Sequence, residues 1–204
     1  MKNEKYSMSF TTGGLFHRKS VEMATLYLER KDWDAVRDKV LSDNLLQART
    51  LESSKRVCRE IISRLRKLTS PELDFLVRAS FQEQAYLLWI AVCRRYKFIE
   101  EFAMEVLRER YLSLKTDLRY EDFDSFFNRK ADWHEELDQI RPATRNKLRQ
   151  VMFKILHEAD LLTSNNTINT VILSPSLLEA IHHGIGRDEL LFPAFESDLR
   201  TAAR

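Results

Sequence analysis

Apolar residues recur at three- and four-residue steps along most of this chain, the spacing of amphipathic helices. The sequence predicts caps at the starts of several of these helices: Asp32, either Ser53 or Ser54, and Ser70, which Pro71 follows in the first helical turn. The expected helices cover about residues 17–30, 33–41, 54–68, 71–80, 82–95, 97–112 and 142–162, and a further helix begins near residue 174.

The stretch QAYLLWIAVC, residues 84–93, is apolar nearly all round, which predicts a central buried helix. Its uninterrupted apolar run, residues 85–92, is too short to cross a bilayer. Turn formers are scarce, with four Gly and four Pro in 204 residues, and this disfavours a turn-rich all-β fold. We therefore predict a mostly all-α, globular fold whose β-like piece is a short β-hairpin wing near residues 166–173.

A polar, acidic junction, LKTDLRYEDFDSF, divides the chain into two halves. With 44% hydrophobic residues, the chain can bury a sizeable core. We predict an N-terminal helix-turn-helix-like segment over residues 1–69 and central hydrophobic helices over 70–115. A C-terminal helix-turn-helix-like or winged-helix-like segment is predicted over residues 116–204.

Charge is unevenly distributed although the net charge is only +2. Residues 1–68 carry a net charge of +6, residues 69–140 carry −5, and residues 141–204 carry +1. A basic first third beside an acidic middle gives the molecule a directional field that the whole-chain charge conceals.

The two cysteines, Cys58 and Cys93, each lie inside an apolar helical pattern and form no closely spaced pair. This arrangement is typical of buried thiols in a reducing compartment. The N-terminal sequence MKNEKYSMSF has no apolar segment of the kind found in secretory signals. We therefore expect a cytoplasmic protein that does not associate with membranes.

The first basic segment, LESSKRVCREIISRLRKLT, carries six basic residues against two acidic ones. Its apolar stripe predicts that most of the cations face away from the core, with Arg64 near the edge of the stripe. If this is the second helix of a helix-turn-helix, its polar start would lie at a DNA groove. The predicted phosphate contacts are Ser54, Lys55, Arg56, Arg59, Arg66 and Lys67.

A second basic helix, PATRNKLRQVMFKILHEADLL, has no acidic residue before Glu158 and receives the same interpretation. Its predicted contacts are Thr144, Arg145, Lys147, Arg149 and Lys154. Arg56 and Arg145, near the starts of their helices, are the candidates for contacts to base edges, and little sequence preference is expected. The alternative for both helices is an ordinary solvated face.

Other candidate sites have simpler structural explanations. In DWHEELD, His134 begins a zinc-protease-like pattern, but Asp138 stands where the second histidine would be. The acidic cluster in YEDFDSFF is typical of a first helical turn. The two glycines of HHGIGRDE are typical of a helix C-terminus. The tryptophans Trp33, Trp89 and Trp133 are predicted to anchor the core. We predict no catalytic residues, no cofactor and no metal site.

The order of segments resembles the BrxA family, the small core proteins of bacterial BREX (bacteriophage exclusion) phage-defence systems. The segments are KDWDAV, SSKRVCREIISRLRKLTSPEL, LLWIAVCRRYKFIEEFAMEVLRER, KADWHEEL and TRNKLRQVMFKILHEADLL, and the resemblance runs from about Thr11 to Leu178. It implies an all-helical, distantly NusB-like fold with helix-turn-helix motifs beside positive surface.

The resemblance also implies a function. It points to a protein that is not an enzyme, binds double-stranded DNA and works with other BREX components, and we expect it to be a monomer when isolated. A protein-interaction or scaffold subunit of the same system is the runner-up. RNA binding, suggested by the NusB-like comparison, and a metalloenzyme are further alternatives.

Overall fold

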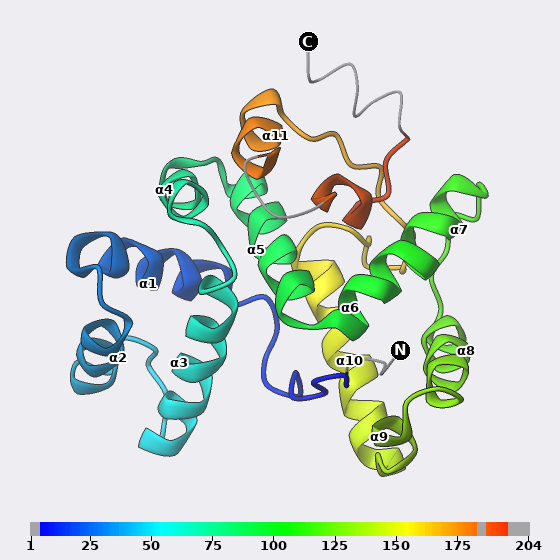
Figure 1. Cartoon of the computed structure of the whole chain (residues 1–204), viewed down its shortest axis with the longest axis horizontal. Coiled ribbons are helices and arrows are strands. Elements are labelled where there is room, and N and C mark those ends of the chain that lie inside the picture. Colours follow the sequence, from blue (N-terminus) through cyan, green and yellow to red (C-terminus); the bar gives the residue numbers. More distant parts are fainter. Residues whose placement is uncertain (1–4, 183–186, 196–204) are drawn as a thin grey trace.

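The computed structural model describes residues 5–182 and 187–195, and the predicted all-α fold is confirmed: the described residues contain no strand (Figure 1). A first group of helices lies on one side of the molecule: α1 (His17–Arg30), α2 (Trp33–Ser42), α3 (Leu51–Leu65) and α4 (Ser70–Arg78). The remaining elements are α5 (Phe81–Arg95), α6 (Lys97–Phe102), the π-helix η1 (Ala103–Arg108), α7 (Glu109–Leu112), α8 (Tyr120–Ala131), α9 (Glu135–Asp138), α10 (Pro142–Glu158), α11 (Pro175–His182) and the 3-10 helix η2 (Asp188–Leu191).

The capping residues at the helix starts are of the predicted chemical type, but two of them lie at other positions than predicted. Asp32 caps α2 as predicted, because its carboxylate accepts the Asp34 N–H at 2.9 Å. The cap of α3 is Thr50, so the prediction of Ser53 or Ser54 was wrong by about one turn. The cap of α4 is Thr69, one residue before the predicted Ser70; together with Glu72 it forms a capping box that satisfies two backbone N–H groups.

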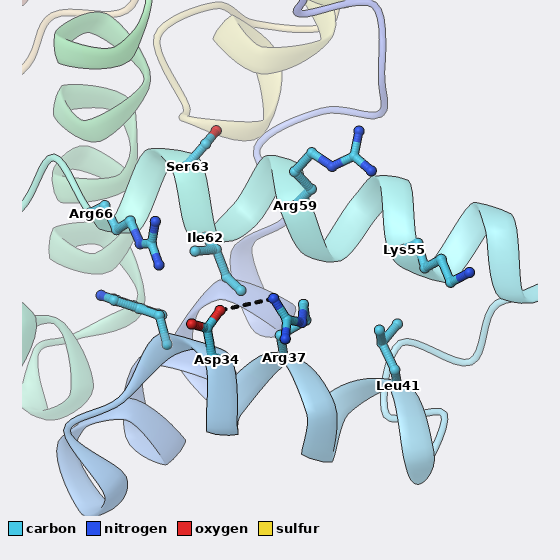
Figure 2. Close-up of a pocket in the computed structure, with 9 residues that line it drawn as sticks. Asp34, Arg37, Leu41, Lys55, Arg59, Ile62, Ser63 and Arg66 are labelled. Atoms are coloured by element: carbon cyan, nitrogen blue, oxygen red, sulfur yellow. Dashed lines mark hydrogen bonds and ion pairs between the residues drawn. The ribbon is translucent and has the colours of Figure 1, made fainter.

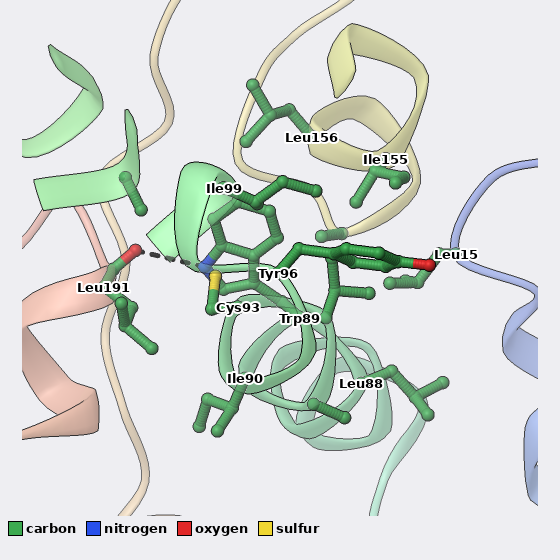
Figure 3. Packing of buried hydrophobic residues seen from close by; sticks show 14 of the residues in the cluster. Leu15, Leu88, Trp89, Ile90, Cys93, Tyr96, Ile99, Ile155, Leu156 and Leu191 are labelled. Atoms are coloured by element: carbon green, nitrogen blue, oxygen red, sulfur yellow. Dashed lines mark hydrogen bonds between the residues drawn. The ribbon is translucent and has the colours of Figure 1, made fainter. Parts of the chain in front are cut away.

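Helix α5 is the central helix, as predicted. Every residue from Ala85 to Cys93 is buried, and α5 packs against α1, α3, α4 and α6. Trp89 is fully buried and donates its indole N–H to the Leu191 carbonyl at 3.0 Å, which ties η2 to the core (Figure 3). A buried indole needs such an acceptor, because an unpaired N–H there would cost more than the bond contributes.

The predicted wing near residues 166–173 is not formed by paired strands. Two isolated bridges, Leu162 with Ile168 and Asp117 with Thr167, take its place. The ladder does not extend because the Val171 N–H donates to the Pro193 carbonyl instead of to a neighbouring strand. The segment is therefore a tight turn held against two other parts of the chain.

The predicted burial is found for both cysteines but not for all three tryptophans. Trp89 is buried and Trp33 is half-buried, but Trp133 is 76% exposed, so its predicted role in the core was wrong. Trp133 lies in the turn between α8 and α9, where the helical spacing used to place it no longer holds. Both cysteines, Cys58 and Cys93, are free and buried as predicted, and burial raises the pKa of each thiol.

Candidate nucleic-acid interface

Helix α3 separates its apolar and basic residues onto opposite sides. Cys58, Ile61 and Leu65 are fully buried against the core. The five cations predicted to face away from the core are all exposed: Lys55, Arg56, Arg59, Arg66 and Lys67. The amphipathic pattern of the sequence is therefore sufficient to orient this helix.

Arg64 belongs to the core and not to the basic face. Its side chain is 3% exposed, its Nε donates to the Glu60 carboxylate at 2.7 Å, and one terminal nitrogen donates to the Gly14 carbonyl at 2.7 Å. The Tyr96 hydroxyl donates to the same carboxylate, and burial together with this bond raises the pKa of Tyr96 to about 12. This Glu60–Arg64–Tyr96 network joins α3 to the segment before α1 and to the end of α5.

Ser54 is a correction to the predicted contact set. It is 3% exposed and its hydroxyl has no hydrogen-bond partner, so it offers nothing to a phosphate. The prediction placed Ser54 at the open start of the helix. Because the helix begins at Leu51, Ser54 lies a turn further in, on the buried side.

The exposed cations of α3 are largely unpaired. Lys55 forms an ion pair with Glu52 at 3.0 Å, and both side chains are solvated. Among the described residues, no carboxylate lies within ion-pair distance of Arg56, Arg59, Arg66 or Lys67. Their charge is therefore available to an external anion.

A groove of about 430 Å³ runs between α2 and α3, which also pack against each other. Figure 2 shows Ile62 and Arg66 projecting from α3 toward α2 and Lys55 on the same side of the helix, while Arg59 borders the groove from further round α3. On the α2 side, Arg37 pairs with Asp34 at 2.8 Å. The groove is lined by Trp33, Asp34, Arg37, Leu41, Lys55, Arg59, Ile62, Ser63 and Arg66.

Two of the five residues in the second predicted set, on α10, are held by contacts within the protein. Arg145 donates to the side chain and the backbone carbonyl of Asp124, at 3.1 and 2.9 Å, and to Asn128 at 2.7 Å, while its guanidinium lies over the Phe127 ring. Arg149 pairs with the same Asp124 carboxylate and lies over Tyr120. These two arginines fasten α10 to α8, which sequence spacing could not show.

The other members of that set remain in solvent. Thr144 and Lys147 are exposed, and Lys154 is exposed with Glu158 at 3.7 Å. In Figure 1, α3 and α10 both begin at the lower edge of the view, on opposite sides of the molecule. The two sets are therefore separate patches, and the one on α3 carries more free charge.

The helix-turn-helix interpretation requires a short turn between two helices, and the two candidate connections differ in length. Residues 43–50 join α2 to α3, which is longer than the three- or four-residue turn of that motif. Residues 139–141 join α9 to α10, which is the usual length, although α9 is a single turn. For both halves the motif stays a prediction.

The histidine considered as a metal ligand and the acidic cluster considered as a cation site make contacts that support the fold. His134 stacks on Tyr6 with ring centroids 3.9 Å apart and shares a hydrogen bond with Glu136 at 3.1 Å. Asp122 caps α8 by accepting the Arg119 N–H, as expected for an acidic first turn. Within the described part of the chain, no three His, Cys, Asp or Glu residues are placed to hold a metal ion. His183, Gly184 and Gly186 lie outside the described residues.

Over the same described residues, no helix is both long enough and apolar enough to span a membrane.

Comparisons with known proteins agree over most of the chain. A BREX protein BrxA of Bacillus cereus (strain H3081.97) is 27% identical over 166 residues, which is 76% of this chain and 81% of that protein. A BREX protein BrxA of Escherichia coli O9:H4 (strain HS) is 24% identical over 194 residues, 94% of this chain and 91% of that protein. A crystal structure of an uncharacterized protein from Magnetospirillum magneticum shares the fold, with a TM-score of 0.78 and 19% identity over 92% of this chain and 96% of that one. The BrxA family model matches residues 4–184, and the chain therefore belongs to the BrxA family.

Proposed function

We propose that this protein is a non-catalytic accessory component of a bacterial BREX phage-defence system that binds double-stranded DNA. We place it in the cytoplasm, as a monomer when isolated, working beside other BREX components. Family membership and the names of the relatives from Bacillus cereus and Escherichia coli support the BREX role.

The observation that carries DNA binding is the exposed, unpaired charge of α3. Four cations of α3 and the two residues that follow it have no carboxylate partner among the described residues: Arg56, Arg59, Arg66 and Lys67. Such groups neutralise phosphates and release counterions, which is the main sequence-independent term in binding to DNA. No geometry here selects a base edge, so we expect broad sequence preference.

The test is fluorescence anisotropy with a labelled duplex of about 20 base pairs across a salt series. Four phosphate contacts give a slope between about −3 and −4 in a plot of log affinity against log salt. The variant Arg56→Glu/Lys67→Glu should weaken binding strongly and reduce the slope by about two. Its counterpart on α10, Lys147→Glu/Lys154→Glu, should weaken binding less, because that patch has fewer free cations.

Absence of salt-dependent binding by folded wild-type protein would refute the proposal. A duplex RNA of the same length serves as competitor. If it displaces the DNA at equal or lower concentration, α3 is an RNA-binding surface instead.

A further inference from the structure

The groove between α2 and α3 differs in chemistry from the outward face of α3. Its floor is apolar, with Ile62 from α3 and Trp33 and Leu41 from α2. Lys55 and Arg66 stand on its α3 side, and Arg66 points toward α2 (Figure 2). The surface therefore combines a partly buried apolar floor, in which Ile62 is only 8% exposed, with positive charge at each end.

The spacing along α3 places these groups on one face. Lys55, Ile62 and Arg66 stand at positions i, i+7 and i+11, so the backbone positions of the two cations are three helical turns, or about 16.5 Å, apart along the helix axis. Helix α2, at ten residues, is about 15 Å long and forms the opposite wall. The groove is thus long enough to hold about three turns of another helix.

A DNA backbone fits this groove poorly. Phosphates gain nothing from contact with an apolar floor, and Arg37 on the α2 wall is already paired with Asp34. The neighbouring Asp38 also pairs with Arg37, so the α2 wall carries little net positive charge. An amphipathic protein segment, by contrast, can match both the apolar floor and the cations.

We propose that this groove binds an acidic amphipathic helix of a partner protein. The partner's carboxylates, eleven residues apart, would pair with Lys55 and Arg66, and its apolar residues between them would cover Ile62 and Leu41. Arg66 has no carboxylate partner within the described chain, and the solvated pair of Lys55 with Glu52 is weak enough to exchange. Charge complementarity would fix the register, while the apolar contact would supply the affinity.

The chain provides a closely matched control. Arg56 and Lys67 are also one Arg and one Lys, eleven residues apart on the same segment, but each is displaced by one residue from the groove pair. Arg56 is rotated by about 100° around the helix from Lys55, and Lys67 lies past the end of α3, where it lines a different pocket with Arg94 and Glu100; neither residue lines the groove. The two double reversals to Glu change the net charge equally.

The probe is a labelled synthetic peptide of about 16 residues, a helix former with two glutamates eleven residues apart and two leucines between them on the same face. Its reference has the same composition in scrambled order. By fluorescence anisotropy, we expect micromolar binding of the probe and at least about tenfold weaker binding of the scrambled peptide. Lys55→Glu/Arg66→Glu should weaken probe binding by about tenfold or more, and Arg56→Glu/Lys67→Glu by less than about threefold.

Leu41→Gln, which removes apolar floor without changing charge, should also weaken the probe, and circular dichroism checks that each variant is folded. Equal binding of both peptides, equal loss in both double variants, or no binding to the folded wild type would overturn the proposal. Wild-type self-association that Lys55→Glu/Arg66→Glu abolishes would make a second copy the occupant instead. Peptide and DNA binding are separable, because Arg56→Glu/Lys67→Glu should weaken DNA binding and leave the peptide nearly unaffected.

Discussion

Replacing Arg64 with alanine should destabilise the protein far more than replacing any exposed arginine of α3. Arg64 is 3% exposed and holds the Glu60 carboxylate at 2.7 Å inside the protein. Without Arg64, that carboxylate would keep only the Tyr96 hydroxyl, and the Gly14 carbonyl would lose its donor. A buried charge without its counterion is among the most costly single defects in a folded protein.

The magnitude follows from these contacts. Removing one partner of a buried ion pair costs about 3–5 kcal/mol. Because Tyr96 still solvates Glu60, we expect the lower part of that range, about 3–4 kcal/mol. For a protein of this size, 1 kcal/mol shifts the melting temperature by about 2–4 °C, so Tm should fall by roughly 10 °C.

The assay is urea unfolding followed by far-ultraviolet circular dichroism at pH 7, with Arg66→Ala as the matched control. Arg66 is exposed and should change the free energy of unfolding by less than about 0.5 kcal/mol. The double variant Glu60→Gln/Arg64→Met should recover much of the loss, because it removes the buried charge and keeps an acceptor for Tyr96.

A loss below about 1 kcal/mol for Arg64→Ala would refute this reasoning. The side chain would then spend much of its time in solvent, and its charge would belong to the exposed face of α3 after all.

Two further predictions concern other charged contacts. Arg145→Ala should cost about 1–2 kcal/mol in urea unfolding, because it breaks the hydrogen bonds to Asp124 and the contact with Phe127, whereas Lys147→Ala should be nearly neutral. The pKa of Tyr96 rises from 10.0 to about 12 on folding, so the stability that its proton provides is complete below about pH 10 and is lost as pH rises toward 12. Tyr96→Phe should therefore lower stability at pH 7 by about 1 kcal/mol and flatten its decline between pH 10 and 12, measured as the urea midpoint against pH.

The sequence correctly predicted the structural features that depend on one helix alone. The three- to four-residue period located α3 and α5 and separated the cations of α3 from its apolar stripe, because burial of one face is enough to orient a helix. The sequence did not locate the caps of α3 and α4, where neighbouring Ser and Thr residues compete. It also misplaced Trp133, which lies beyond the end of α8.

Contacts between distant segments could not be predicted at all. Arg145 and Asp124 are 21 residues apart, and nothing local indicates that they meet. One signal was available within α3. Glu60 and Arg64 are four residues apart and flank the buried Ile61, a spacing that allows an intrahelical ion pair. An ion pair beside the apolar stripe could have been recognised as a candidate for burial.

The charge that a helix carries in the sequence differs from the charge that it offers to a partner. In α3 and its C-terminal extension, the buried pair removes one cation and one anion, which leaves five exposed cations against the single exposed Glu52. In α10, Asp124 engages two of the four predicted cations. Both helices are basic in the sequence, yet folding leaves α3 with most of the free charge. Any polyanion that this protein binds should therefore meet α3 first, and reversals on α3 should outweigh those on α10.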